Sequence, residues 1–265
     1  MSDAYIETTV LTDILVKPGS RKHQRATAAL KRYENTLLPV YSIKEWKAGP
    51  LDTFVYLHNK LLFTRSYSQT LNAVAALPRL YQKSTAIEAL AAAATTLRAS
   101  PQKFAGLGGG DDEMADSFRL ALASLIIRSW RKRRKITTHV VDDLSCYVEV
   151  APRVGQDGYL DLAPEECDGD QECCLAPQLK SQTKLLEALL DAVPKNSGRR
   201  EDQKRRQALK RLIRHPNQIV DREVCRDLGD AIFAFFCPQT AVVLTTNLRD
   251  HTPLANSLGK KAEKP

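Results

Sequence analysis

The acidic residues of this chain have side-chain types and spacings that could support catalysis or metal binding. The stretch CRDLGDAIFAFFCPQTAVVLTTNLRDH, residues 225–251, places Asp227, Asp230 and Asp250 around a strongly apolar run. Like charges crowded near a core repel one another and cost free energy to desolvate. These carboxylates therefore either point outward into solvent or surround something cationic.

Two glutamates from the first part of the chain complete a candidate cluster. Glu7 lies in the first predicted strand, and Glu45 lies in the first turn of the helix that follows the second. Asp227 and Asp230 are three residues apart, which predicts that they share one face of a helix. Asp250 comes just after the last predicted strand. In an open parallel sheet, the carboxyl ends of the strands form the usual site, so we expect these acids to meet there.

A carboxylate cluster of this kind suits a hard cation. Mg²⁺ and Mn²⁺ prefer oxygen ligands and keep several waters. Two such ions about 4 Å apart can activate a water, hold a phosphodiester and stabilise the leaving oxygen.

Each acid also has a simpler explanation. Glu45 forms an S-x-x-E capping box with Ser42. Asp227 would complement a helix N-terminus. Asp250 could cap the helix predicted to begin at Thr252, although Thr252 is an equally good cap. It is the occurrence of all of them in this order that favours a shared site.

The predicted elements would position these acids on an α/β sheet. Strands alternate with helices at both ends of the chain, which indicates parallel neighbours. We assign residues 1–62 and 206–265 to this core and residues 63–205 to a mostly helical insert. The main predicted elements are strands at 5–10, 36–41 and 241–247, helices at 43–62 and 221–236, and a small β-rich piece at 136–150.

Composition narrows the class of protein. The 265-residue chain has a formal net charge of +8, which favours a polyanionic partner such as nucleic acid. It has no apolar run long enough for a membrane span and no basic, apolar leader, so we expect a cytoplasmic protein without a membrane partner. Six cysteines are too few for a disulfide scaffold.

A Cys-containing, turn-rich loop is predicted at residues 155–177. Its sequence CDGDQECC has no C-x₂-C pair, so a zinc site would need help from Cys146 and His139. Alternatively, the thiols of this loop are redox-active, or the loop has no special role.

Two basic runs could bring phosphates to an acidic site. One is RSWRKRRK, residues 128–135, in which Arg131, Arg133 and Arg134 would contact substrate and Trp130 would stack on a base. The other spans residues 195–216 and forms an amphipathic helix. A solvated helix face is the alternative for both.

Four blocks in this order resemble the signature blocks of PIN-domain nucleases: YIETTVLTDIL, LLPVYSIKEWKAG, DLGDAIFAFF and VVLTTNLRDHTPLANSLGK. The resemblance covers about residues 4–62 and 220–260. It implies a three-layer fold with a short parallel sheet flanked by helices. It also implies a Mg²⁺- or Mn²⁺-dependent endonuclease that acts on RNA more readily than on DNA.

The resemblance also implies roles for particular residues. Glu7, Glu45, Asp230 and Asp250 would be catalytic metal ligands, with Asp227 in support. Thr8, Asn247 and His251 would lie beside the substrate.

Two positions depart from the family pattern. Glu7 stands where the first acid is usually Asp, and Asn247 stands where many members have a fourth Asp. The alternative is therefore a catalytically impaired interaction module that binds nucleic acid or a protein through its insert. A homodimer, a regulatory protein partner, and a role as a toxin or anti-phage defence effector are further expectations from the resemblance.

Overall fold

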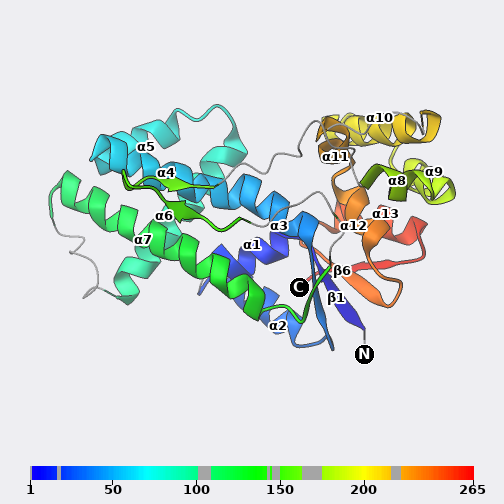
Figure 1. The fold of residues 1–265 in the computed structure, drawn as a ribbon, viewed down its shortest axis with the longest axis horizontal. Coiled ribbons are helices and arrows are strands. Elements are labelled where there is room, and N and C mark those ends of the chain that lie inside the picture. The colour runs from blue at the N-terminus through cyan, green and yellow to red at the C-terminus, as the bar shows by residue number, and fades with distance from the viewer. Residues whose placement is uncertain are drawn as a thin grey trace.

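Five short strands form the sheet at the centre of the molecule: β1 (Asp3–Ile6), β2 (Thr36–Pro39), β3 (His139–Val141), β6 (Ala241–Leu244) and β7 (Lys261–Glu263). The computed structural model describes residues 2–16, 19–100, 109–141, 144, 150–162, 175–215 and 222–265. The strands lie in the order β3–β2–β1–β6–β7, and every pairing is parallel. The predicted α/β class, with a parallel sheet flanked by helices, is confirmed (Figure 1).

Both faces of the sheet are buried. Along β1, Ala4 and Ile6 belong to one hydrophobic core, and Tyr5 between them belongs to the other. This follows from the two-residue period of a strand, whose successive side chains point to opposite faces. Parallel sheets are characteristically covered on both faces.

The first core is formed by helices from the first half of the chain, which extend away from the sheet as a helical arm (Figure 1). The arm consists of α4 to α7, and α1 to α3 lie between it and the sheet. The elements on this side are α1 (Thr8–Val16), α2 (Arg21–Leu30), α3 (Val40–Trp46), the π-helix η1 (Lys47–Leu51), α4 (Asp52–Thr64), α5 (Tyr67–Ala75), α6 (Leu80–Ala99), α7 (Asp111–Lys132) and the 3₁₀ turn η3 (Arg133–Lys135).

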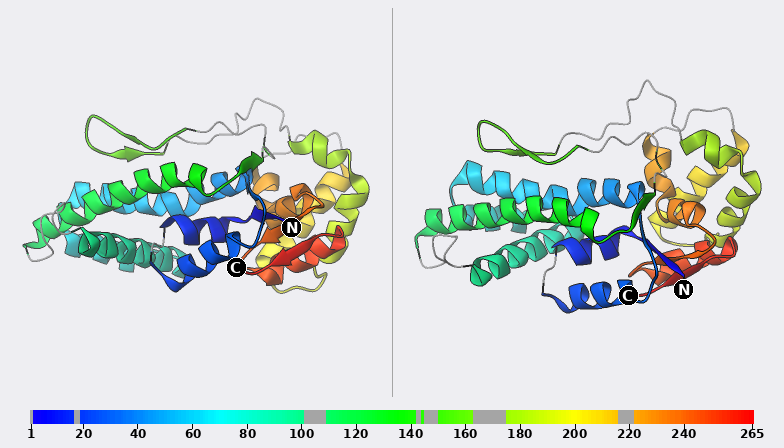
Figure 2. Two further views of the ribbon diagram at one scale, coloured as in Figure 1. Left: turned by 90° about the horizontal axis from the view of Figure 1, so that it is seen from below. Right: turned by 60° about the horizontal axis from the view of Figure 1, so that its bottom comes forward.

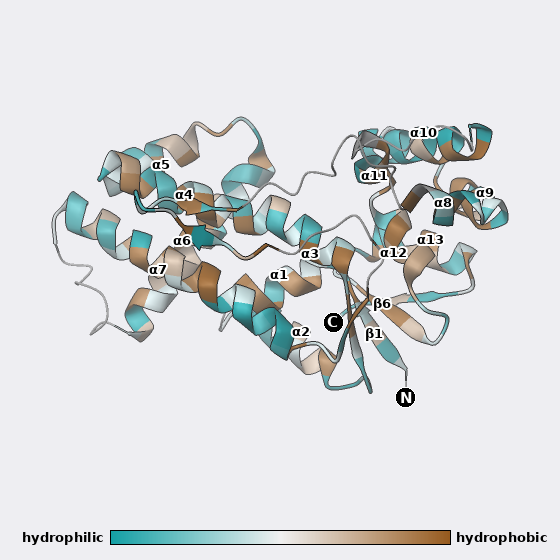
Figure 3. Ribbon diagram, in the orientation of Figure 1, coloured by the Kyte–Doolittle hydropathy of each residue, from teal (hydrophilic) through white to brown (hydrophobic). Residues whose placement is uncertain are grey.

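Helices from the second half of the chain cover the other face (Figure 2). They are α8 (Leu175–Lys180), α9 (Thr183–Ala192), α10 (Arg200–Arg214), α11 (Arg222–Leu228), α12 (Asp230–Phe236) and α13 (Leu248–Ser257). Figure 3 shows the outer helix α10 with polar residues on much of its surface, and its apolar residues Leu209 and Leu212 are buried in the second core. None of the helices within the described ranges is long and apolar enough to cross a bilayer.

The middle of the chain contributes to both the sheet and the arm. β3, from the predicted β-rich piece, forms an edge strand of the main sheet beside β2. A separate hairpin of β4 (Arg153–Val154) and β5 (Leu160–Asp161) is tied to α4, because the Asn59 amide both donates to and accepts from the backbone of Leu160 at 2.8 and 2.9 Å. Most of the predicted Cys-containing loop, and Cys146, lie outside the described residues.

Three local predictions around the acids are wrong. The strand predicted at 5–10 ends early: β1 ends at Ile6 and helix α1 begins at Thr8, so Glu7 lies between them. Ser42 does not cap a helix: it lies inside α3, where its hydroxyl donates to the Ile6 carbonyl at 2.7 Å.

Residues 222–236 form two helices, because Gly229, with φ +47° and ψ −117°, separates α11 from α12. Asp227 and Asp230 therefore lie on different helices, and Asp230 begins α12.

A further boundary differs from prediction near Asp250. α13 begins at Leu248, ahead of Thr252, and Asn247 occupies its N-cap position. Asp250 consequently lies in the first turn of α13, where a carboxylate complements the helix dipole.

Replacing Gly229 with alanine tests the importance of this helix break. An L-residue is strained at positive φ, so we expect Gly229→Ala to lower the free energy of unfolding by about 1–2 kcal/mol. Gly49→Ala is the matched control, because Gly49 lies within η1 and an added Cβ would meet nothing within 4 Å. Equal stability of the two variants in chemical denaturation would contradict a strained break at Gly229.

Candidate functional site

Four of the five acids expected to meet at the carboxyl edge of the sheet lie there: Glu7, Glu45, Asp230 and Asp250. Glu7 directly follows β1, and α3, which carries Glu45, directly follows β2. Electrostatic interactions couple Glu7 with Asp230, and Glu45 with both of them. Asp250 is coupled in turn to Asp230. The parallel topology thus gathers residues that are far apart in the sequence.

Glu7 is held firmly against the end of β6. Its carboxylate accepts hydrogen bonds from the backbone N–H of Thr9 at 3.0 Å, from the Thr9 hydroxyl, and from the Thr245 hydroxyl at 3.2 Å. Only 4% of Glu7 is exposed. Burial raises the pKa of Glu7, although the charge of His251 and the hydrogen bonds from Thr9 oppose the rise.

Glu45 is a second acid of the cluster, and its pKa is perturbed toward neutral pH. Burial raises its pKa to about 7, and the neighbouring charges of Glu7 and Asp230 add to this effect. Hydrogen bonds from Thr8 and Tyr41 act in the opposite direction. The Thr8 hydroxyl donates to Glu45 Oε2 at 2.6 Å, so Thr8, predicted to contact substrate, positions Glu45 in this structure.

Asp230 is bound by two cationic side chains. Its Oδ2 accepts from Arg205 Nη2 at 2.5 Å, and its Oδ1 lies 3.3 Å from His251 Nε2. Burial opposes ionisation of Asp230, but His251 and Arg205 outweigh it and lower the pKa of this carboxyl.

His251 is buried beside this acid, against the edge of the Phe233 ring. Burial disfavours its charge, yet the hydrogen bond and charge of Asp230 raise its pKa. Its Nδ1 has no hydrogen-bond partner among the described residues. His251 therefore contacts the acidic cluster through Asp230, but its own ring is buried.

Asp250 is closed off by a bidentate arginine. Its two oxygens accept from Arg199 Nη1 at 2.5 Å and Nη2 at 2.9 Å. Asn247 Nδ2 donates to Asp250 Oδ2 at 2.8 Å. The hydrogen bond from Arg199 lowers the pKa of Asp250 to about 2, even though burial opposes this. A neutral amide at position 247 thus supports Asp250, where an aspartate would repel it.

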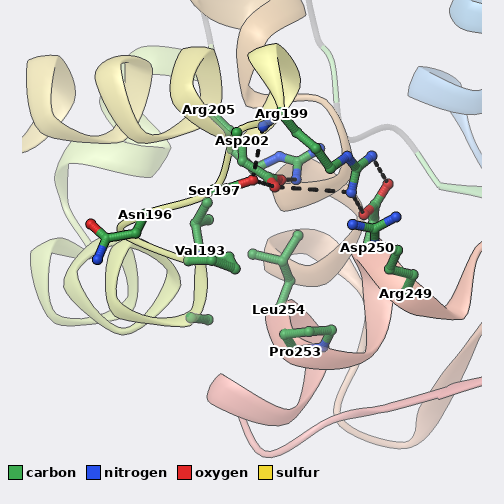
Figure 4. A pocket seen from close by; sticks show the side chains of 13 residues that line it. Val193, Asn196, Ser197, Arg199, Asp202, Arg205, Arg249, Asp250, Pro253 and Leu254 are labelled. Carbon is green, nitrogen blue, oxygen red and sulfur yellow. Dashed lines mark hydrogen bonds and ion pairs between the residues drawn. The ribbon is translucent and has the colours of Figure 1, made fainter.

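Arg199 and Arg205, the cationic partners of Asp250 and Asp230, come from the start of α10. This role is not among the predictions from the sequence. Asp202 links the two arginines: its Oδ1 lies 3.5 Å from Arg205 Nη1 and its Oδ2 lies 3.9 Å from Arg199 Nη1. Figure 4 shows Arg199, Asp202 and Asp250 joined in this network. The i, i+3 spacing of Arg199, Asp202 and Arg205 was the available signal. The sequence predicts instead that this basic run brings phosphates to the acidic site or forms a solvated helix face.

Asp227 faces other partners. Its Oδ1 lies 3.2 Å from Lys204 Nζ and 3.6 Å from Arg226 Nε. Asp227 therefore pairs with basic side chains of its own and is not part of the cluster of Glu7, Glu45 and Asp230.

The basic run at residues 128–135 lies away from the acids. It immediately precedes β3, so it falls at the amino edge of the parallel sheet, opposite the carboxyl edge. Arg131 and Arg134 are exposed there. The prediction for Arg133 is wrong, because this residue is 1% exposed and its guanidinium lies 3.7 Å from the centre of the Trp130 ring. Trp130 stacks on Trp46 in the core and cannot stack on a base.

The cluster offers oxygen donors that suit a hard cation. Its negative charges are already balanced in part by neighbouring arginine and histidine side chains. Carboxylate oxygens are the ligands that Mg²⁺ and Mn²⁺ prefer, and Glu7, Glu45 and Asp230 share an excess of like charge. Within the part of the chain that the structure describes, no group of three or more His, Cys, Asp or Glu side chains is arranged to hold a metal ion. The residues fit by donor chemistry, and full use of Asp230 would require Arg205 to release an oxygen.

The fold and site together define an α/β protein with a buried carboxylate cluster at the carboxyl edge of its parallel sheet. Comparisons of the chain with family models, with curated proteins and with solved structures gave no match.

Neutralising Glu45 should stabilise the protein at alkaline pH. Because the pKa of Glu45 is raised from 4.5 to about 7, its contribution to stability is full below pH 4.5 and is lost as the pH rises through 7. Glu45→Gln removes this loss while keeping an acceptor for Thr8. We expect its free energy of unfolding at about pH 8, in EDTA, to exceed that of the parent by about 1–3 kcal/mol.

Glu187→Gln, an exposed substitution on α9, should show no such gain. A Glu45→Gln variant less stable than the parent at that pH would contradict the proposed repulsion.

Proposed function

We propose that this protein is a metal-dependent endonuclease that hydrolyses phosphodiester bonds, with RNA as its substrate. The observation that carries the proposal is the convergence of Glu7, Glu45 and Asp230 at one sheet edge, with the pKa of Glu45 at about 7. Such a perturbed acid beside further buried carboxylates is typical of a catalytic site. RNA is preferred over DNA on the resemblance to PIN-domain nucleases, and the net charge of +8 suits a polyanion.

Glu7, Glu45 and Asp230 would hold Mg²⁺ or Mn²⁺. When bound, the ion supplies a Lewis acid for phosphate oxygens and lowers the pKa of a coordinated water. The chain itself supplies positioning. Thr8 orients Glu45, Thr245 and Thr9 orient Glu7, and His251 orients Asp230.

The raised pKa of Glu45 belongs to the metal-free site, where burial and the charges of Glu7 and Asp230 disfavour its ionised form. A divalent cation would favour the ionised form, so metal binding would be coupled to release of a proton from Glu45.

The second candidate is an interaction module without catalysis. It is favoured by the arginines of α10, which already neutralise Asp230 and Asp250 within the protein. In that case the charge balance of the cluster would serve stability alone.

Cleavage assays separate the two candidates. Purified protein with labelled single-stranded RNA and Mn²⁺ should cut the RNA, and Asp230→Asn should reduce the rate by at least about a hundredfold. Asp227→Asn is the matched control and should retain most of the activity, because Asp227 pairs with Lys204 outside the cluster.

Glu45→Gln provides a second loss-of-function variant that leaves the Arg205 pair intact. Absence of metal-dependent cleavage of RNA and DNA by the folded parent protein would refute the nuclease.

A further inference from the structure

A cavity of about 510 Å³ adjoins the acidic cluster on the side of α10 and α13. It lies between the loop that joins α9 to α10 and the first half of α13, and both Arg205 and Asp250 form part of its wall (Figure 4). This volume falls within the range of cavities that bind small organic ligands.

One side of the cavity carries three guanidinium groups, from Arg199, Arg205 and Arg249. Arg249 is exposed and forms no hydrogen bond or ion pair with the other described residues. Arg205 is 6% exposed, and its Nε is buried with no hydrogen-bond partner among the residues described. The cavity wall thus holds guanidinium donors that the protein itself does not fully satisfy.

The acids of the wall are neutralised in place. Asp250 is bound by Arg199 and Asn247, and Asp202 accepts from the Ser197 hydroxyl at 2.5 Å as well as pairing with Arg205.

Arg199 and Arg205 are occupied by Asp250, Asp202 and Asp230. The guanidinium of Arg249 is therefore left in the lining without a carboxylate partner among the described residues.

The carbonyl groups at the end of α9 would otherwise repel an anion. Arg206 Nη1 donates to the carbonyls of Leu190 and Val193 at 2.8 and 2.6 Å, which offsets part of the negative charge of these oxygens.

Val193, Pro253 and Leu254 form an apolar part of the lining, which Figure 4 shows below Arg199 and Arg205. Arg249 precedes Pro253 by one turn of α13, so its guanidinium borders this apolar part. A flat aromatic group fits against such a surface while an attached anion reaches the arginines. Nucleotides combine these two features.

We propose that this cavity binds one nucleotide of the strand that the acidic cluster cuts. Arg249 contacts its phosphate, supported by Arg199, and the base lies against Leu254 and Pro253. The inference rests on the proposed nuclease function for the identity of the strand, but nucleotide binding itself requires no metal ion.

Binding of adenosine 5′-monophosphate to the full chain in EDTA, measured by isothermal titration calorimetry, tests the proposal. We expect saturable binding at one site, with inorganic phosphate and adenosine each binding at least about tenfold more weakly. Arg249→Gln should weaken nucleotide binding about tenfold. Arg200→Gln, an exposed neighbouring arginine outside the cavity, should leave it unchanged.

Three results would overturn the nucleotide site: no binding by the parent protein, equal losses in Arg249→Gln and Arg200→Gln, or inorganic phosphate binding as tightly as the nucleotide. The proposed nuclease function is tested separately, by the cleavage assay. Metal-dependent cleavage without nucleotide binding would remove only the cavity assignment, and nucleotide binding without cleavage would remove only the nuclease.

Discussion

Repulsion among buried carboxylates is the constraint on which the second half of this structure depends. Glu7, Glu45, Asp230 and Asp250 reach the same edge of the sheet because parallel strands end there. Burial alone would disfavour their charges, and the raised pKa values of Glu7 and Glu45 reflect this. Asp230 and Asp250 stay ionised because α10 and α13 bring cations to them.

The two arginine pairs differ in which member solvent reaches. The side chain of Arg205 is 7% exposed and that of Arg199 is 30% exposed. Their carboxylate partners rank in the opposite order, because the side chain of Asp250 is 9% exposed and that of Asp230 is 22% exposed. Each pair therefore has one buried member, and Arg199 is the arginine that solvent reaches more readily. Glu7 and Glu45, which have no arginine partner in the described structure, are the acids that most need a cation.

Sequence reasoning located the acids because local pattern and topology were sufficient. Apolar β-rich runs marked β1, β2 and β6, and the rule that parallel strands end together placed Glu7 and Glu45 side by side. It failed where a contact between distant residues decides the outcome. Ser42 looked like a cap but bonds to Ile6, and Trp130 looked like a nucleic-acid contact but packs on Trp46. The break at Gly229 depends on a backbone conformation that glycine permits but does not reveal in a sequence.

The interpretation of Asn247 changes with the structure. The sequence suggests that Asn247 replaces a fourth acid and weakens the site. In the structure, its amide donates to Asp250 and helps to keep that carboxylate ionised.

The central proposal is that Glu7, Glu45 and Asp230 would bind a hard divalent cation. The most direct test is titration of the metal-free protein with Mn²⁺ near neutral pH, followed by the electron paramagnetic resonance signal of the free ion. The claim predicts saturable binding by the parent protein, and affinity reduced by more than about tenfold in Glu7→Gln and Glu45→Gln. No saturable binding, or the same affinity in all three proteins, would contradict it.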